Sequence, residues 1–358
     1  MIDTDIDSDV PAESVQTGHP YEALTPDVVL DAVDSVPQLA GGRSDGRQLA
    51  LNSYENRVYQ VGIEDAQPII VKFYRPARWS AAAIQEEHDF AETLAQAEIP
   101  AVAPLRDAAG VSLFEYAGFR FALYPRRGGR TPDLEDPDNL MWMGRFLGRI
   151  HAIGATEDFQ HRPTLDIENF GWVSYRYIMS TDFVPQYLHE AYSTLVEDVL
   201  KQVQVSFEQV GLVERVDGDS SGRVAQIRLH GDCHPGNILW TDGGPHFVDF
   251  DDARRGPAVQ DLWMLLSGDR AQMTGQIDEI LAGYSEFMDF NPRELHLIEP
   301  LRTLRMIHYS AWLARRWDDP TFPMHFPWFG ESRYWEEQIL ALREQAAILN
   351  EEPLRWMG

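Results

Sequence analysis

Apolar residues gather into short strand-like segments in the first third of the chain. RVYQVGI (57–63) and PIIVKFY (68–74) are rich in β-branched and aromatic residues, with the polar stretch EDAQ between them. This pattern predicts two strands joined by a turn. VSLFEY (111–116) and FRFALYP (119–125) repeat the pattern around an Ala-Gly pair, which is a hairpin signal. The sequence therefore predicts a small β-rich unit here.

Two helices are expected to accompany these strands. TPDVVLDAV (25–33) begins with a threonine N-cap and a proline at the first helical position. SAAAIQEEHDFAETLAQAE (80–98) has an amphipathic period and a serine cap at Ser80. Residues 1–24 carry six acidic groups and little apolar patterning, so we expect a disordered acidic tail.

The pattern changes after Pro125. RRGGRTPDLEDPDN (126–139) is polar and rich in glycine and proline, which is typical of a boundary between lobes. Helical periodicity then dominates. Helices are expected at about 138–153, 184–211, 258–269, 273–289, 292–317 and 331–349, with strand pairs near 224–230 and 237–250 and an exposed loop at 213–223.

The expected fold class is α+β, with a small β-rich N-terminal lobe at 25–125 and a large, mostly helical C-terminal lobe at 126–358. A cleft between two such lobes is a natural site for a small ligand. This arrangement alone suits many enzymes.

Composition narrows the classes of function. The chain has 358 residues, 44% of them hydrophobic, and a formal net charge of −27, which would repel a nucleic-acid backbone. The acidity would attract cationic substrates, or it only makes an acidic surface. No apolar run is long enough to span a membrane, the N-terminus lacks the features of a signal peptide, and a single cysteine allows no intrachain disulfide. We expect a cytoplasmic monomer that binds neither nucleic acid nor membrane.

The most informative segment is RLHGDCHPGNILWTDGGPHFVDFDDARRG (228–256). Asn237 follows Asp232 by five residues, and Asp249 ends the apolar run PHFV twelve residues later. Phosphoryl transfer from ATP needs a carboxylate to deprotonate the acceptor hydroxyl and oxygen ligands to hold Mg²⁺ on the phosphates. This spacing is the one by which protein kinases supply that set. We therefore expect Asp232 to be the catalytic base, Asn237 and Asp249 to bind Mg²⁺, and Asp249 to act in catalysis through the metal.

The same segment allows other interpretations. His230, Asp232 and His234 would make a zinc site, although two structural histidines explain the residues equally simply. Cys233 would be a redox sensor if its thiol were accessible, and otherwise a spectator. Asp261, near the start of the next helix, would hydrogen-bond the catalytic loop or merely complement the helix dipole.

Lys72 is one of only two lysines in the chain and lies within the apolar strand PIIVKFY. A lysine there would contact the α- and β-phosphates of ATP and be held by a glutamate from the following helix. That helix offers Glu86 and Glu87, and the apolar stripe of the helix favours Glu87. Snorkelling at a strand edge is the alternative interpretation.

The remaining nucleotide contacts are less specific. The hairpin LNSYENRVYQV (51–61) contains no glycine, yet Ser53 and Asn56 would cover the phosphates, unless they are ordinary turn residues. Tyr124 and Arg126 lie where a linker between the lobes would bind adenine, although a buried strand that ends in a turn also explains them. We further hypothesise that arginines near this lobe relieve the acidic background around ATP; they are Arg75, Arg78, Arg126, Arg127 and Arg130.

These segments, together with WLARRWDDPTFP near the C-terminus, resemble the bacterial stress response kinase A family, within the aminoglycoside phosphotransferase and choline kinase-like group. The similarity runs from about Leu24 to Pro353. The resemblance implies a kinase-like bilobal fold, Asp232 as base, Asn237 and Asp249 as Mg²⁺ ligands, and Ser53 near the phosphates of ATP. It also implies a cytoplasmic serine/threonine protein kinase that autophosphorylates and supports survival under stress, and in that family the hairpin lacks glycine. The acidic tail, the 213–223 loop and the extreme charge depart from the family.

Three functions follow from these residues. The first is Mg²⁺-ATP-dependent phosphorylation of protein Ser and Thr hydroxyls. The second keeps the chemistry and changes the acceptor to an amino alcohol, homoserine or an aminoglycoside, on fold analogy alone. The third is a pseudokinase that binds nucleotide without turnover, although every expected catalytic residue is present. Because the segment from Asp252 to Pro257 is short, we expect no regulatory activation loop.

Overall fold

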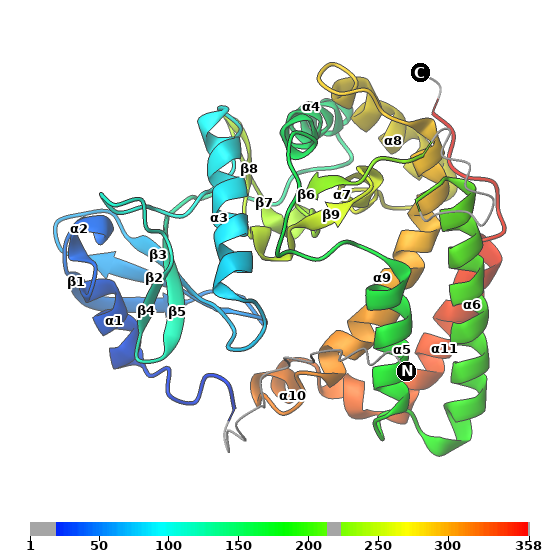
Figure 1. Cartoon of the computed structure of the whole chain (residues 1–358), viewed down its shortest axis with the longest axis horizontal. Coiled ribbons are helices and arrows are strands. Elements are labelled where there is room, and N and C mark those ends of the chain that lie inside the picture. The colour runs from blue at the N-terminus through cyan, green and yellow to red at the C-terminus, as the bar shows by residue number, and fades with distance from the viewer. Residues whose placement is uncertain (1–18, 213–222, 357–358) are drawn as a thin grey trace, which may run out of the picture.

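The computed structural model describes residues 19–212 and 223–356, which form two lobes with α3 (Ala81–Gln96) lying between the N-terminal sheet and the C-terminal lobe (Figure 1). The predicted α+β architecture, a small lobe built on a β-sheet followed by a mostly helical lobe, is confirmed. Most of the expected acidic tail, up to residue 18, and nearly all of the expected loop at 213–223 lie outside the described residues.

The N-terminal lobe contains an antiparallel sheet with the strand order β1-β2-β3-β5-β4. Its strands are β1 (Ser44–Ala50), β2 (Arg57–Ile63), β3 (Ile69–Phe73), β4 (Phe114–Tyr116) and β5 (Phe119–Pro125). Ala117 and Gly118 both have positive φ, 49° and 81°, as the tight turn between β4 and β5 requires. Sequence patterning missed β1 because most of its residues are exposed or polar.

Three helices complete this lobe. α1 (Pro26–Asp34) and α2 (Pro37–Ala40) pack against the sheet, where Val29 and Val33 join the core formed with Val71 and Phe73. α3 begins where the sequence predicts, because the Ser80 hydroxyl accepts a hydrogen bond from the Ala83 N–H at 3.1 Å. The N-terminal lobe is thus a twisted sheet with helices that bury its apolar side chains.

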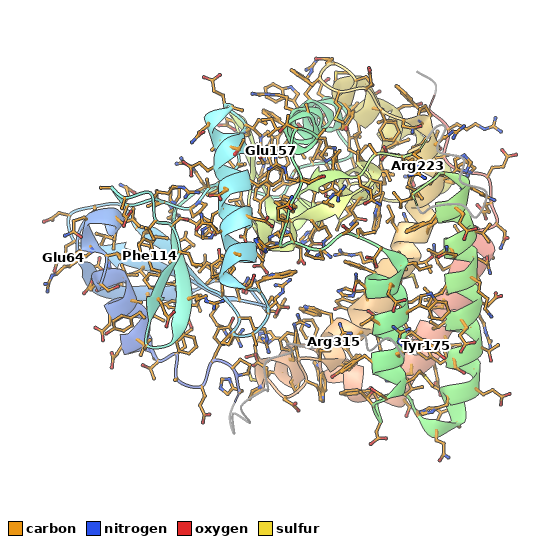
Figure 2. The ribbon with its side chains drawn as sticks, in the orientation of Figure 1. Glu64, Phe114, Glu157, Tyr175, Arg223 and Arg315 are labelled. Atoms are coloured by element: carbon orange, nitrogen blue, oxygen red, sulfur yellow. The ribbon has the colours of Figure 1, made fainter. Side chains whose placement is uncertain are left out.

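The C-terminal lobe is mostly helical. Its helices are α4 (Pro137–Gly154), α5 (Val173–Met179), α6 (His189–Gln209), α7 (Val259–Trp263), α8 (Arg270–Tyr284), α9 (Ile298–Ala314), α10 (Thr321–His325) and α11 (Ser332–Ile348). Figure 2 shows Phe114 on β4 in the N-terminal lobe and Tyr175 on α5 in the C-terminal lobe. Within the described part of the chain, no helix is both long and apolar enough to cross a membrane.

The helices differ from expectation at their ends. The expected helix at 258–269 ends at Trp263, and it cannot continue into α8 because Gly268 adopts a φ of 86° and Asp269 starts α8 with a capping box. The expected helix at 292–317 opens as a 3₁₀ turn, Pro292–Leu297, before α9 begins. The short helices α5 and α10 were not predicted, because each is too short to show a clear period.

α4 and α8 pack at close range through glycines. Gly144 and Gly148 of α4 face the backbone of Ile280 and Tyr284 in α8, so any side chain at these two positions would meet main-chain atoms. This close packing fixes α4, which carries His151 to Asp261 below the loop that contains Asp232.

Two small ribbons hold that loop. β7 (Ile238–Thr241) pairs with β8 (Gly244–Phe247), as predicted. β6 (Ile227–Leu229) pairs instead with β9 (Arg254–Gly256), which follows the Asp249 segment, and not with a neighbouring strand. This longer-range pairing brings the loop after β6 and the turn after β8 to the same place.

Candidate active site

A cavity of about 300 Å³ lies between the two lobes. Its lining combines apolar side chains with a few polar ones, as is typical of nucleotide-sized pockets. The lining residues are Leu51, Asn52, Ser53, Val58, Ile70, Lys72, Glu87, Ala91, Val102, Pro104, Tyr124, Pro125, Arg127, Gly236, Asn237, Leu239, Val248, Asp249 and Phe250.

The loop after β6 is held from below by Asp261 of α7. The Asp261 carboxylate accepts hydrogen bonds from the N–H groups of His230 and Gly231, both at 2.9 Å, and lies 3.1 Å from His151 Nε2. Burial alone would raise the pKa of Asp261, but the hydrogen bond from His151 and the charge around it hold that pKa below its usual value. Asp261 therefore hydrogen-bonds the loop after β6, and complementing the helix dipole is not its only role.

Gly231 has a φ of 84°, and a Cβ there would collide with the carbonyl oxygen of Asp252. Only glycine allows the loop to turn this close to the Asp249 segment. The turn presents Asp232, whose side chain is 23% exposed, and leads into Asn237. The Asn237 Nδ2 donates to the Asp232 carbonyl oxygen at 3.0 Å, which leaves the amide oxygen of Asn237 available for a ligand.

The two oxygens of the Asp232 carboxylate have different surroundings. Oδ1 accepts a hydrogen bond from Nη1 of Arg305 in α9 at 2.6 Å. Oδ2 lies 3.6 Å from His234 Nε2, which is beyond a hydrogen bond. Oδ2 therefore accepts no hydrogen bond from the described residues and is available to a ligand.

Asp249 follows β8 with a left-handed backbone, φ 61° and ψ 64°. This conformation is uncommon for a residue other than glycine and marks a strained position of the kind found at functional sites. Its side chain is 47% exposed and lines the cavity beside Asn237. Asp249 and Asn237 thus both line the cavity, and their segments lie side by side because the Val248 N–H donates to the Asn237 carbonyl oxygen at 3.0 Å.

Lys72 is buried among carboxylates. Its Nζ lies 3.2 Å from Glu87, 3.1 Å from Asp249 and 3.4 Å from Asp251. Burial alone would lower the pKa of Lys72, but these three carboxylates outweigh it and raise that pKa well above its ordinary value, so the ammonium stays charged. The Lys72 side chain is only 7% exposed, so it does not snorkel to solvent at a strand edge.

Glu87 rather than Glu86 faces Lys72. The other oxygen of Glu87 accepts from Arg162 Nη2 at 2.9 Å, so an arginine from the C-terminal lobe completes the pair. Glu86 points elsewhere and accepts from the backbone N–H groups of residues 160–162. α3 is thus fixed to both lobes through neighbouring glutamates.

The structure brings Ser53 and Tyr124 to the cavity but leaves Asn56 and Arg126 out of its lining. Asn56 is buried and its Oδ1 accepts from the Arg75 N–H at 3.0 Å, which pins the hairpin to the loop after β3. Arg126 reaches outward to Gln60 Oε1 at 2.7 Å. The expected nucleotide contacts therefore narrow to Ser53, Lys72, Glu87 and Tyr124.

Arg75 and Arg78 do not fit the hypothesis that arginines relieve the negative charge around ATP. Arg75 Nη1 lies 3.1 Å from Asp319 of the C-terminal lobe, and Arg78 pairs with Asp251 and Asp252. Both arginines are committed to these carboxylates. Of the five arginines in the hypothesis, Arg127 alone lines the cavity.

His230 and Cys233 have structural surroundings. His230 Nε2 lies 2.9 Å from the Val248 carbonyl oxygen and its ring packs on Phe250, so it braces the loop. No three His, Cys, Asp or Glu side chains in the described ranges are arranged as a metal site. Cys233 is fully buried, and burial raises the pKa of its thiol well above the usual value, which disfavours the reactive thiolate.

Sequence reasoning missed three residues of this site. Asp251 contacts Lys72 and stands in the quoted VDFDD run, two residues after Asp249, so local spacing offered a signal. Arg162 comes from an irregular loop, and Arg305 from the middle of a long helix. Nothing in the local pattern around these two arginines points to the cavity.

Comparison with known proteins agrees with this geometry. Residues 47–298 match the phosphotransferase enzyme family. The chain is 42% identical over 335 residues to stress response kinase A of Escherichia coli K12, an alignment that covers 94% of this chain and 96% of that protein. With the same coverage it is 41% identical to a Salmonella typhimurium protein named serine/threonine protein kinase RdoA.

Solved structures support the same fold. An amicoumacin kinase in complex with AMP-PNP, Ca²⁺ and Ami superposes with a TM-score of 0.67 at 18% identity, covering 90% of this chain and 94% of that one. A microcompartment-associated aminopropanol kinase superposes with a TM-score of 0.60 at 18% identity, covering 88% and 94%. At these identities the likeness concerns the fold. The match over residues 47–298 and the near full-length relatives show that the chain belongs to the phosphotransferase enzyme family and, within it, to the stress response kinase A family.

Proposed function

We propose that this chain is a cytoplasmic, monomeric kinase that transfers the γ-phosphoryl group of Mg²⁺-ATP to Ser and Thr hydroxyls of proteins, itself included, as part of a stress response. The observation that carries the proposal is the convergence of Lys72, Asn237 and Asp249 on one cavity, with Asp232 in the loop that borders it. The protein acceptor is supported by the printed name of the Salmonella relative.

The cavity suits a nucleotide. Val58, Ile70 and Leu239 give it apolar walls from both lobes, against which an adenine ring would pack. The Lys72 ammonium would bind the phosphates and Glu87 would hold it in place. Ser53, on the hairpin between β1 and β2, would cover the phosphates from the other side.

The donor set also fits Mg²⁺. Asn237 and Asp249 both line the cavity and offer an amide oxygen and a carboxylate, which are hard oxygen ligands, and Mg²⁺ takes few protein ligands beside phosphate oxygens and water. Bound Mg²⁺ supplies neutralisation of the charge on the transferred phosphoryl group.

In the transfer step, the acceptor hydroxyl lies against Asp232 Oδ2, the oxygen without a hydrogen bond in the described structure. The hydroxyl oxygen bonds to the γ-phosphorus as the bond from that phosphorus to the β–γ bridging oxygen breaks. The hydroxyl proton passes to the Asp232 carboxylate, and ADP leaves with the bond's electron pair. Asp261 and Arg305 keep the Asp232 loop in place during the transfer.

The test is incubation with Mg²⁺ and γ-labelled ATP, with and without a generic protein acceptor. We would compare the wild type with Asp232→Asn, which keeps the shape of the side chain and removes its basicity. Asp242→Asn, in the exposed β7–β8 turn, is the matched control.

Label on Ser or Thr with the wild type and the control, but not with Asp232→Asn, would support the proposal. ATP turnover without label on protein would refute the protein acceptor, and a panel of amino alcohols, homoserine and aminoglycosides would then identify the acceptor class. Nucleotide binding without turnover, both with protein and with every alcohol of the panel, would refute the kinase itself.

A further inference from the structure

Arg305 stands next to the proposed base and is not fully used there. Its Nη1 donates to Asp232 Oδ1 at 2.6 Å, and its side chain is 44% exposed. A guanidinium carries five N–H donors in a planar fork. Within residues 19–212 and 223–356, the hydrogen bond to Asp232 is the only one that Arg305 makes. Its remaining donors have no hydrogen-bond partner among the described residues, and the exposure of the side chain leaves them accessible to a ligand beside Asp232.

The carboxylates that lie against the C-terminal end of α9 or in the turn after it already have cationic or N–H partners. Glu55 accepts from Trp312 Nε1 at 2.6 Å and contacts Arg316. Asp319 is held by Arg57 and Arg75. A cationic acceptor such as an aminoglycoside would have to compete with an arginine or an indole N–H at each of these two acidic groups.

Asp251 and Asp252, deeper in the cleft, are paired in the same way. Both contact Arg78, and Asp252 also contacts Arg254. Near Asp232 the chain therefore presents a guanidinium with free donors and, among these carboxylates, none without a partner. The local charge favours an anion beside the acceptor hydroxyl.

The helix that carries Arg305 continues this surface. Tyr309 follows Arg305 by one turn of α9, and its ring stacks on Trp312 with centroids 5.7 Å apart and planes 17° apart. Tyr309 is 39% exposed. An extended segment whose hydroxyl reaches Asp232 would place a flanking residue against Arg305 and the next against this aromatic pair.

We propose that Arg305 is a specificity-determining residue that binds an anionic group next to the acceptor hydroxyl, so that the preferred acceptor is a Ser or Thr flanked by an acidic residue. This inference rests on the proposed protein kinase function. Arginine suits the role because one edge of its fork can hold Asp232 while another binds a second carboxylate, which the point charge of a lysine does less well.

The net charge of −27 acts in the opposite direction at long range, since it attracts cations. At physiological salt, exposed charges are screened beyond about 8 Å. A contact of hydrogen-bond length is screened far less, so the guanidinium decides which acceptor is held once it has arrived. Long-range attraction decides only how often acceptors collide with the protein.

The test uses three peptides that differ only in the residues flanking one serine, which are Asp, Asn or Lys. We expect the wild type to show a kcat/KM at least about tenfold higher for the Asp-flanked than for the Lys-flanked peptide, since one charge-assisted contact contributes about that factor. Arg305→Glu should invert the order, Arg305→Ala should level it, and Arg305→Lys should keep part of the preference. Arg333→Glu, an exposed arginine on α11, is the control and should change nothing.

A purely structural role for Arg305 would lower kcat equally for all three peptides. The proposed role changes KM according to peptide charge and leaves the KM for ATP unchanged. A wild type that prefers the Lys-flanked peptide, or an Arg305→Glu variant with an unchanged preference, would overturn the inference while protein phosphorylation itself stood.

If the wild type labels none of the peptides and no protein, itself included, the protein kinase proposal fails, and the role of Arg305 is decided with two small alcohols, 3-hydroxypropanoate and 3-aminopropanol. Preference for the carboxylate that disappears in Arg305→Glu would support Arg305 as the anion-binding group. Preference for the ammonium, equal rates, or transfer to neither alcohol would overturn it.

Discussion

Replacing Asp319 with alanine should loosen the contact between the lobes and weaken ATP binding. Asp319 lies just before α10, beneath the hairpin that carries Ser53, and its side chain is fully buried. It accepts from Arg57 Nη2 at 3.2 and 3.0 Å, from Arg75 Nη1 at 3.1 Å, and from the Thr321 N–H at 3.1 Å. One carboxylate of the C-terminal lobe thus holds two arginines of the N-terminal lobe.

The size of the effect follows from what remains after the change. Removing one partner of a buried ion pair costs about 3–5 kcal/mol, because the other charge stays buried without compensation. Here Arg57 and Arg75 keep contacts with the Tyr21 ring, and Arg75 also keeps Glu55, so we expect the lower end, about 3 kcal/mol. The loss falls on the contact between the lobes, where it favours states with the hairpin displaced from the cavity.

Nucleotide affinity should report this opening. If the binding-competent arrangement becomes a minor state, the apparent Kd for ATP rises by the inverse of its population, and each 1.4 kcal/mol corresponds to about tenfold. We expect a rise in Kd of about tenfold to a hundredfold, measured by titration with a fluorescent nucleotide, and a lower urea midpoint of the N-terminal lobe.

The neighbouring residue provides the control. Asp318 is exposed, so Asp318→Ala removes the same charge from the same turn without breaking the contact between the lobes. Asp319→Asn keeps an acceptor for the Thr321 N–H and removes only the charge, and it should fall between the two. If Asp319→Ala binds ATP and unfolds in urea as Asp318→Ala does, the contact does not hold the hairpin and this reasoning fails.

Three further predictions concern the core, the pH dependence and the buried lysine. Gly144→Ala should lower the free energy of unfolding, measured in urea, by about 1–3 kcal/mol because the new Cβ meets the α8 backbone. Gly275→Ala, in an open helical position, should raise it by up to about 1 kcal/mol. Equal effects of the two substitutions would contradict the close packing of α4 on α8. Burial raises the pKa of Glu294 to about 7, so the stability that its protonated form contributes is fully present below about pH 4.5 and is lost as the pH rises through 7. The free energy of unfolding of Glu294→Gln should therefore rise by about 3 kcal/mol relative to the wild type between pH 4.5 and 8. Parallel pH profiles of unfolding for the two proteins would exclude this. Lys72→Met should reduce kcat/KM for ATP at least about a hundredfold. Lys201→Met, which removes the exposed lysine of α6, should leave kcat/KM unchanged. Similar kinetics for both variants would show that Lys72 does not bind ATP.

The fold was predictable where one chain segment carries its own signal. β2 and β5 match their apolar runs, and Ser80 starts α3 through a cap that uses only local atoms. β1 and β9 escaped prediction for a physical reason: each is a strand because of the partner it meets, β2 in one case and β6 in the other. Pairing with a distant strand leaves little trace in the local pattern.

The candidate site divides in the same way. Asp232, Asn237, Asp249 and the Lys72–Glu87 pair could be anticipated, because each lies at a fixed spacing within its segment. Asn56 was expected at the nucleotide and instead pins the hairpin, since an asparagine in a turn binds backbone as readily as ligand. Residue type and spacing identify chemistry that is local, and they do not show which way an isolated polar side chain points.

The arginines show why net charge is a poor guide to this site. All but two of the 30 basic residues are arginines, and several are buried against carboxylates from distant segments: Arg162 on Glu87, Arg78 on Asp251 and Arg254 on Asp252. Pairing of this kind removes the charge of both partners from the surface of the cleft. Among the described residues, Arg305 is the arginine that contacts Asp232 and keeps donors without a partner, so we expect it to set the charge that an acceptor meets there. If Arg305 has the role proposed above, a chain that is strongly acidic as a whole selects an acidic acceptor, and that selection depends on one position of α9 that the local sequence pattern did not mark.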